Sequence, residues 1–276
     1  MNIRKVSGFK WTMLALLCLI MAAARVSAAE PVLLLTHAHA HNDYEHARPL
    51  LDALDHGFCS VEADIFLVNG QLLVAHTFGA TKPERTLQSL YLDPLRARVQ
   101  KNGGYVFPNG PEFTLLIDLK EDWHRLYPAL RSTLTNYSDM LTTFRDGVKR
   151  PRAIIVIITG ERSRSMFDGE TTRYAALDGA SADLVSNPAP LLVPWISGDW
   201  RSGFHWNGKG EIPAGQRARL ESIVRQAHEQ GSRVRFWGAP DFPNFWQTMR
   251  DAGVDLINTD DLAGAQRFFE KRESAE

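Results

Sequence analysis

The stretch at residues 60–77 reads SVEADIFLVNGQLLVAHT, the pattern of a strand, a tight turn and a returning strand. Glu62 and Asp64 are two positions apart, so on a strand they project from the same face, roughly 6.6 Å apart along the backbone. The pair Asn69-Gly70 predicts a type I′ turn, because that turn needs positive φ at both central residues. The returning arm then brings His76 back toward the two carboxylates. Two acids on one buried face repel each other unless a cation lies between them, so the stretch predicts half of a metal-dependent active site.

Strand and helix patterns alternate along the rest of the chain. Besides the hairpin, strands are expected at residues 32–35, 113–120, 153–159, 174–177, 191–196, 234–237 and 255–258. Helices are expected at residues 48–56, 87–101, 123–137, 217–230 and 244–252. This alternation predicts a parallel sheet, and right-handed crossovers in a chain of 276 residues favour a closed (β/α)8 TIM barrel. The alternative is an open doubly wound sheet, but no glycine-rich phosphate loop follows the first strand. Residues 197–212 are expected to form a long loop over the barrel mouth.

The N-terminal segment has the features of an export signal. Three basic residues precede an unbroken apolar run at residues 13–24, and small residues follow at 26–29. The run is too short to span a bilayer comfortably. The sequence therefore predicts a signal peptide at residues 1–29, a single barrel domain at residues 30–276, and an exported protein that is periplasmic or secreted.

Charge and cysteine content limit the partners and the means of stabilisation. Loss of residues 1–29 removes four basic residues and no acidic one, so the net charge falls from −1 to −5. No basic stripe is visible, so we expect no binding to nucleic acid. Only Cys59 remains after cleavage, which excludes an internal disulfide. The fold must therefore depend on its own hydrophobic core.

Three acidic residues stand at or near the ends of neighbouring predicted strands. Glu62 and Asp64 share one strand, and Asp118 lies near the end of the next. Carboxylate oxygens without a cysteine ligand suit one hard divalent cation, Mg²⁺ or Ca²⁺, better than zinc. The alternative is that these acids form ion pairs with basic residues at the strand ends.

His41 and His76 are the candidate acid and base. A cation that holds a phosphodiester between two imidazoles allows one histidine to take the proton of the nucleophile and the other to protonate the leaving alkoxide. Lys120 could neutralise charge on a phosphoryl oxygen, or it could form a salt bridge with Asp118 or Glu62. Trp237, at a strand end, could line a pocket for an apolar or sugar-like leaving group, although most tryptophans are expected in the core.

The first histidines also allow a different metal site. His37, His39 and His41 alternate, so they share one face of a strand. An HxH pair of this kind predicts a binuclear metal hydrolase in which His39 and His41 are ligands. That site would need histidines on later strands, and the only histidines after His76 are His124, His205 and His228, in helix-like or loop-like segments.

Four motifs together resemble one superfamily. They are HNDY at residues 41–44, EAD at 62–64 with a histidine about a dozen residues later, IDLK at 117–120, and RFWGAPD at 235–241 followed by GVDLINTDDL at 253–262. This pattern is similar to the phospholipase C-like phosphodiesterases, which include glycerophosphodiester phosphodiesterases, phospholipases D of the spider-venom type and bacterial phosphatidylinositol phospholipases C. It is closest to the branch named altered inheritance of mitochondria protein 6.

The resemblance implies a metal-dependent phosphoric diester hydrolase. It implies His41 and His76 as the acid/base pair, one Mg²⁺ or Ca²⁺ on Glu62, Asp64 and Asp118, and substrate contacts from Lys120 and Trp237. It also implies a small-molecule or lipid phosphodiester as partner, with room for transient contact at a membrane surface. No protein partner is evident from the sequence.

The chain departs from the glycerophosphodiesterase pattern at both histidines. The usual HRG is His41-Asn42-Asp43, and the usual HD is His76-Thr77. Asn42 is therefore a candidate substrate-binding residue in place of an arginine that could bind phosphate with two hydrogen bonds. The alternative function is a barrel that binds a phosphodiester or lipid ligand without turning it over.

Overall fold

The computed structural model describes residues 32–273, so the predicted signal peptide lies outside the described residues. Within that range, no helix combines the length and the apolar character that crossing a membrane would require. The helices are α1 (Leu51–Asp55), α2 (Asp93–Lys101), α3 (Trp123–Thr135), α4 (Asp183–Ser186), α5 (Trp200–Gly203), α6 (Ala214–Glu229), α7 (Pro243–Asp251) and α8 (Leu262–Glu273).

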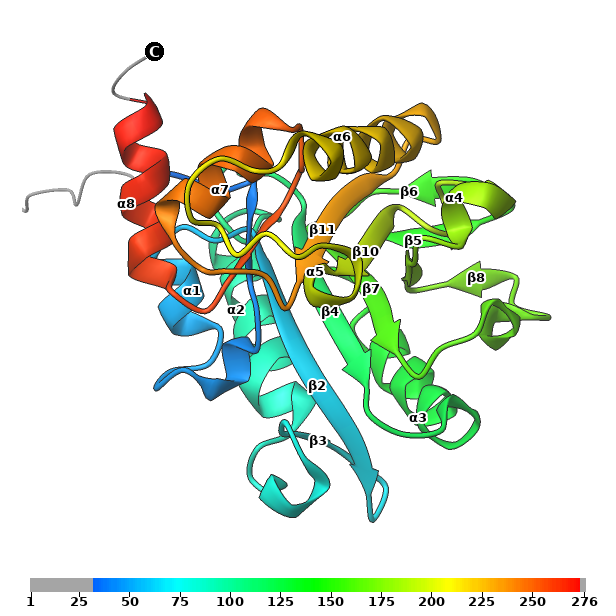
Figure 1. Cartoon of the computed structure of the whole chain (residues 1–276). Coiled ribbons are helices and arrows are strands. Elements are labelled where there is room, and N and C mark those ends of the chain that lie inside the picture. The colour runs from blue at the N-terminus through cyan, green and yellow to red at the C-terminus, as the bar shows by residue number, and fades with distance from the viewer. Residues whose placement is uncertain (1–31, 274–276) are drawn as a thin grey trace, which may run out of the picture. The chain divides into compact units, whose positions relative to one another are not determined.

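Eight parallel strands form the barrel (Figure 1). They are β1 (Ala38–Ala40), β2 (Ser60–Val68), β4 (Phe113–Leu119), β7 (Ile154–Gly160), β9 (Ala176–Gly179), β10 (Trp195–Asp199), β11 (Arg233–Trp237) and β12 (Ile257–Thr259). Each strand pairs with the next in the order β11-β10-β9-β7-β4-β2-β1-β12. A parallel bridge between Arg235 and Leu256 joins the two ends of this order. The predicted (β/α)8 barrel is confirmed, and the open doubly wound alternative is wrong.

The hairpin predicted at residues 60–77 forms. β3 (Gln71–Val74) pairs with β2 in antiparallel fashion, outside the barrel order. Asn69 and Gly70 have φ values of 50° and 80°, which confirms the type I′ turn. On β2, Val61, Ala63 and Ile65 belong to the hydrophobic core, whereas the alternate residues are the buried polar ones. Because side chains alternate between the two faces of a strand, one face of β2 packs in the core and the other carries the polar residues of the site.

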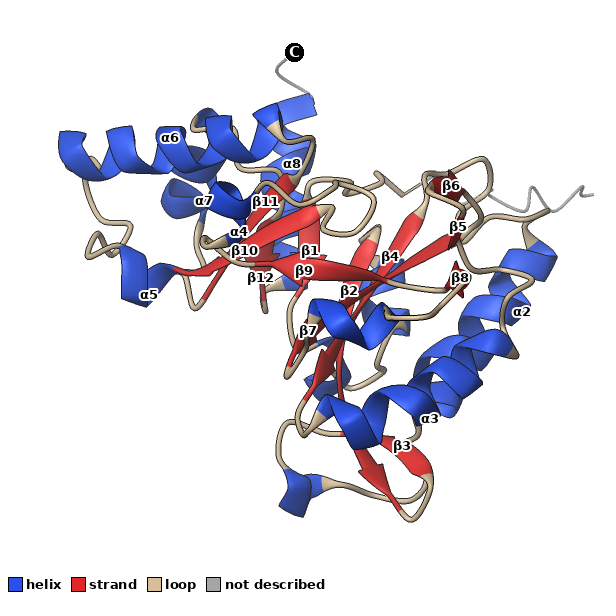
Figure 2. Ribbon diagram, turned by 90° about the vertical axis from the view of Figure 1, so that its right-hand side faces the viewer, coloured by secondary structure: helices blue, strands red, loops and turns tan. Residues whose placement is uncertain are grey.

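Helices cover the outside of the barrel in separate groups. Figure 2 shows α2 and α3 running beside the strands β2 and β4, and the hydroxyl of Tyr137 after α3 donates a 2.6 Å bond to Asp93 of α2. In Figure 1, α6 lies beside β11, and α7 lies between α6 and α8. These helices therefore cover the outer faces of the strands.

Two local expectations are wrong. The first strand is Ala38–Ala40 and not residues 32–35, because Leu35 makes only a single bridge, to Phe58, before the chain turns. Residues 197–212 do not form one long loop. β10 extends to Asp199 and the helix α5 follows, since the aromatic side chains of this segment pack into the core: the rings of Trp200 and Phe204 stack at 4.0 Å.

Some elements have no counterpart in the sequence prediction. A small antiparallel sheet contains β5 (Thr143–Arg145), β6 (Val148–Arg150) and β8 (Thr172–Arg173), and α4, α5 and α8 were not expected. The two- and three-residue strands are too short to show a period in the sequence.

Candidate active site

The site lies at the carboxyl ends of the barrel strands, where TIM-barrel sites are found. A cavity of about 790 Å³ opens there. Seven of the eight site residues expected from the sequence line it: His41, Asn42, Glu62, His76, Asp118, Lys120 and Trp237. The eighth, Asp64, is fully buried next to them.

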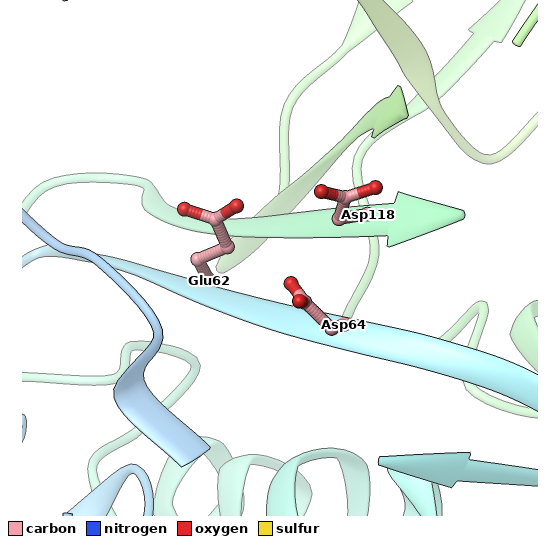
Figure 3. A group of neighbouring side chains, drawn as sticks. All are labelled: Glu62, Asp64 and Asp118. Carbon is pink, nitrogen blue, oxygen red and sulfur yellow. The ribbon is translucent and has the colours of Figure 1, made fainter. Parts of the chain in front are cut away.

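The three predicted metal ligands converge. Glu62 and Asp64 rise from β2 and Asp118 rises from β4, and Figure 3 shows their carboxylates on the same face of the two strands. Asp64 and Asp118 are direct partners in the parallel register, so the strand pairing itself places them side by side. One oxygen atom from each of the three residues lies within 4.8 Å of the others.

The carboxylate cluster fits a hard cation. Asp64 Oδ1 and Asp118 Oδ1 are buried without a hydrogen-bond partner, an arrangement that costs free energy unless another group satisfies them. Burial, reinforced by the neighbouring charge of Glu62, raises the pKa of Asp64 to about 7, and burial also raises the pKa of Asp118. A Cβ at Gly160 would lie 1.9 Å from Asp118 Oδ1, so only glycine leaves that oxygen its place. Three oxygen ligands without sulfur suit Mg²⁺ or Ca²⁺.

Lys120 bridges two of these carboxylates. Its Nζ lies 2.8 Å from both Asp64 Oδ2 and Asp118 Oδ2. Burial opposes its charge, but the two carboxylates outweigh burial and raise the pKa of Lys120 to about 12. The salt bridge considered from the sequence therefore exists with Asp118 and not with Glu62. A permanent positive charge stands at the edge of the cluster.

Tyr44 is a site residue that sequence reasoning missed. Its ring is buried, and its hydroxyl oxygen lies 2.6 Å from Asp64 Oδ2, 2.8 Å from Asn42 Oδ1 and 3.0 Å from His76 Nδ1. Its position three residues after His41, in the HNDY motif, was the only available signal. The left-handed conformation of Asn42, with φ 45°, turns the chain so that Tyr44 reaches back into the barrel.

The two candidate catalytic histidines enter the cavity from different strands. His76 follows β3, its side chain is 54% exposed, and its Nδ1 lies 3.5 Å from Asp64 Oδ2. His41 follows β1, where its backbone N–H donates to Thr259, and its Nδ1 lies 2.9 Å from Asp260 Oδ1. Burial lowers the pKa of His41, but the hydrogen bond to Asp260 and the charge of Glu62 outweigh burial and raise it.

Glu62 forms an ion pair with a buried arginine that sequence reasoning also missed. Arg235, on β11, lies with a guanidinium nitrogen 3.2 Å from Glu62 Oε2 and another 3.5 Å from Asp178 Oδ2. Burial opposes the charge of Glu62, but Arg235 and His39 outweigh burial and keep the pKa of Glu62 well below its usual range. An arginine between apolar strand residues was the available signal. Glu62 therefore stays ionised inside the barrel.

The histidine pattern does not assemble a second metal site. His39 is fully buried, with Nδ1 2.7 Å from Ser60 Oγ and Nε2 3.3 Å from Glu62 Oε2, and burial lowers its pKa to about 4. His37 is exposed and contacts the backbone of Asp255. Within residues 32–273 the carboxylate cluster includes no histidine. The geometry therefore favours one ion over the binuclear alternative.

The tryptophans divide as expected. Trp200 and Trp246 are fully buried, whereas Trp237 is 40% exposed and lines the cavity. The aromatic side chain at the end of β11 is therefore in place to contact a substrate.

Comparison with known proteins identifies the relatives of this chain. Residues 30–178 match the AIM6-like phosphodiesterase domain, and residues 233–263 match the glycerophosphoryl diester phosphodiesterase family. Altered inheritance of mitochondria protein 6 from Eremothecium gossypii is 32% identical over 90% of this chain and 72% of its own length. The homologue from Arthroderma benhamiae is 29% identical over 84% of this chain and 83% of its own. A glycerophosphodiester phosphodiesterase structure from Agrobacterium tumefaciens covers 84% of this chain and 99% of its own, with 16% identity and a TM-score of 0.49.

The names of these relatives correct the expected localisation. The relatives are fungal proteins named for altered inheritance of mitochondria, a name that contradicts the expected export. The prediction of a periplasmic or secreted protein is therefore wrong. The apolar run from which it was drawn precedes the described residues.

Proposed function

The chain belongs to the AIM6-like phosphodiesterase family, and we propose that it is a metal-dependent phosphoric diester hydrolase that uses two histidines as general acid and base. One observation supports this proposal above the others. Three carboxylates converge at the floor of a cavity that two histidines from separate strands also line, and two of their oxygens lack a partner.

Glu62, Asp64 and Asp118 are the residues that would hold the cation, Mg²⁺ or Ca²⁺. When bound, such a cation neutralises the charge that develops on a phosphoryl oxygen. Lys120 supplies a second positive charge beside it, fixed by its two carboxylate contacts.

His76 is the proposed general base. Tyr44 has one hydroxyl proton, and the shortest of its contacts, at 2.6 Å, is to the carboxylate of Asp64. The phenolic oxygen then accepts a hydrogen bond from the N–H at His76 Nδ1, 3.0 Å away. That tautomer leaves the lone pair of His76 Nε2 free. As the oxygen of the nucleophile bonds to phosphorus, its proton passes to Nε2.

His41 is the proposed general acid. Its Nδ1–H donates to Asp260, and the raised pKa of His41 keeps the ring protonated to higher pH than an ordinary histidine. As the bond between phosphorus and the leaving oxygen breaks, Nε2 of His41 gives its proton to the departing alkoxide. His41 is then neutral and His76 is protonated, so the two rings together carry the same number of protons as before the reaction.

The experiment is a diesterase assay on purified protein. Aryl phosphodiesters and lysophospholipids are offered with chelator, with Mg²⁺ and with Ca²⁺, and His41→Ala and His76→Ala are assayed beside the wild type. We expect turnover that needs a cation. His76→Ala should slow both substrates, whereas His41→Ala should slow chiefly the lysophospholipids, whose alkoxide leaving group needs a proton. Activity on lysophospholipids that survives both chelation and His41→Ala would rule the proposal out. Phosphorus NMR of the product then shows whether water or a neighbouring substrate hydroxyl is the nucleophile, since the second gives a cyclic diester.

A second candidate function is ligand binding without turnover. Lys120 already balances charge within the cluster, and Asn42 stands in place of a phosphate-binding arginine. Tight binding of a phosphodiester with no hydrolysis across a broad panel of diesters would favour this function, and measurable turnover would end it.

A further inference from the structure

The cavity has two chemically different halves. The ligands, the two histidines and Lys120 come from β1, β2, β3 and β4 or directly follow them. The other half is formed by the ends of β7, β9, β10 and β11 and is lined mostly by small residues, among them Gly160, Gly179, Ala180, Ser181, Ala182 and Gly198. Besides Arg235, which is paired with Glu62, two arginines line this second half, Arg162 and Arg201, and the proposed chemistry uses neither of them.

Arg162 is a half-buried arginine with no carboxylate at ion-pair distance in the described part of the chain. Its guanidinium donates to the backbone carbonyl oxygens of Asp178 and Gly160. Within residues 32–273 it makes no salt bridge, because the side chain of Asp178 is already bound by Ser197, Thr159 and Arg235. Two carbonyl contacts hold the guanidinium in place, and its charge acts on Asp178 through space without an ion-pair contact.

Arg201 reaches the same half from α5. Its side chain is 74% exposed, and its nearest carboxylate, Asp199 Oδ1, is 3.9 Å away. The oxygens of Asp199 already accept bonds from Ser202 Oγ and from the backbone N–H of Arg201. The guanidinium lies against Gly238, where a Cβ would be 2.9 Å from its Nε, and Gly238 has a φ of +64°. A glycine at the end of β11 therefore makes room for this arginine at the cavity wall.

The charges of this half favour an anion. Arg235 is already paired with Glu62 and Asp178. Arg162 and Arg201 line this half with Asp199 as the remaining carboxylate, so two positive charges face one negative charge there. A guanidinium presents its donors in a planar fork that matches the oxygens of a phosphate or a carboxylate. Lys120, by contrast, already forms ion pairs with two carboxylates of the cluster, Asp64 and Asp118.

We propose that one ester arm of the substrate carries a second anionic group, a phosphate monoester or a carboxylate, which Arg162 and Arg201 bind. Trp237, exposed at the same wall, packs against the carbon chain between the two anionic groups. This inference rests on the proposed diesterase function and specifies its substrate class. The scissile phosphate lies over the carboxylate cluster, and the second anion lies over the ends of β7 and β10.

The test compares matched diesters. Aryl phosphodiesters whose second arm is propyl, carboxypropyl or phosphopropyl are assayed with the wild type, Arg201→Gln and Arg162→Met. Arg225→Gln, on the outer helix α6 and away from the cavity, is the matched control. We expect the wild type to prefer an anionic arm by about ten-fold in kcat/KM. Arg201→Gln should lose that preference while its rate on the propyl diester stays unchanged, and Arg225→Gln should behave as wild type.

A binding measurement separates failure of this inference from failure of the proposed function. Calorimetric titration with propane-1,3-diol bisphosphate, and with propyl phosphate for comparison, needs no turnover. Weaker binding of the bisphosphate to Arg201→Gln, with propyl phosphate unaffected, supports the inference even if no diester is cleaved. Arg201 is exposed, so its replacement should not disturb folding, whereas Arg162→Met also removes two backbone contacts. A wild type that treats neutral and anionic arms alike, or an Arg201→Gln variant with unchanged bisphosphate affinity, overturns the inference. The two anionic arms decide between phosphate and carboxylate.

Discussion

The hydroxyl of Tyr44 donates to Asp64 Oδ2 over 2.6 Å. The hydroxyl oxygen of Tyr44 also lies 3.0 Å from His76 Nδ1, so the buried phenol connects a proposed metal ligand to the proposed base. Because a phenol has a single proton, this contact fixes which nitrogen of His76 is protonated. Tyr44 is therefore a positioning residue, although it does not line the cavity.

Replacing Tyr44 by Phe should lower kcat by about ten- to a hundred-fold and change KM little, because the ring still packs but His76 loses the acceptor that sets its tautomer. Steady-state kinetics on an aryl diester measures both constants, and thermal unfolding checks that the fold is kept. An equal loss in Tyr44→Phe of substrate affinity and of kcat would assign the hydroxyl to binding instead.

The two histidines should differ in their dependence on the leaving group. His41→Ala should lose about 10²- to 10⁴-fold in rate on diesters with alkyl leaving groups, which need a proton as they depart. The same variant should be nearly unaffected with p-nitrophenolate, which leaves without protonation. His76→Ala should slow both substrates to a similar extent. If His41→Ala slows both alike, the acid and base assignments are reversed or wrong.

Asp260 should set the alkaline limit of activity. The contact with Asp260 helps to raise the pKa of His41, so the protonated acid persists at low pH and is lost as the pH rises through that raised value. Asp260→Asn weakens this contact and should move the alkaline limb of the pH–rate profile to lower pH. A diester with an alkyl leaving group is the substrate to use. With p-nitrophenolate as leaving group, which needs no proton from His41, Asp260→Asn should not shift the pH–rate profile.

The barrel and the carboxylate cluster could be predicted because each depends on local patterns. The period of two in β2 and the Asn69-Gly70 turn are written into consecutive residues, and parallel register brings Asp118 beside Asp64. Tyr44 and Arg235 could not be predicted in the same way. Tyr44 reaches Asp64 across a turn with a left-handed residue, and Arg235 meets Glu62 from a strand more than 170 positions away. Contacts of this kind depend on barrel closure, which no short window of sequence encodes.

Without a cation, the carboxylate cluster should destabilise the protein as the pH rises. Burial and the charge of Glu62 raise the pKa of Asp64 to about 7 from an ordinary 3.8, so the folded protein binds more protons than the unfolded chain between these values. The Tm of the metal-free protein should therefore fall as the pH increases from about 4 to 7. Added Mg²⁺ or Ca²⁺ should raise the Tm, and more so at pH 7 than at pH 5.

Asp64→Asn is the matched variant for this experiment. It removes the buried charge and should raise the Tm of the metal-free protein near neutral pH, with about 2 to 4 °C for each kcal/mol gained. It should also reduce the increase in Tm that the cation gives to the wild type. An unaltered response to the cation in Asp64→Asn would show that the ion binds elsewhere.

Arg235 should be required for stability as well as for the site. Glu62 is buried and its ionised form depends first on Arg235, so Arg235→Met leaves a carboxylate without its main counter-charge inside the barrel. Removing one partner of a buried ion pair costs about 3–5 kcal/mol in the free energy of unfolding. Urea unfolding of the metal-free protein measures this loss. Arg225→Met, at an exposed position on α6, should change the same quantity by no more than about 0.5 kcal/mol.

The double variant Arg235→Met, Glu62→Gln should recover part of the stability, because the unpaired charge is then gone. A double variant no more stable than Arg235→Met would mean that Arg235 acts through Asp178, Ser197 and Asn258 and not through Glu62.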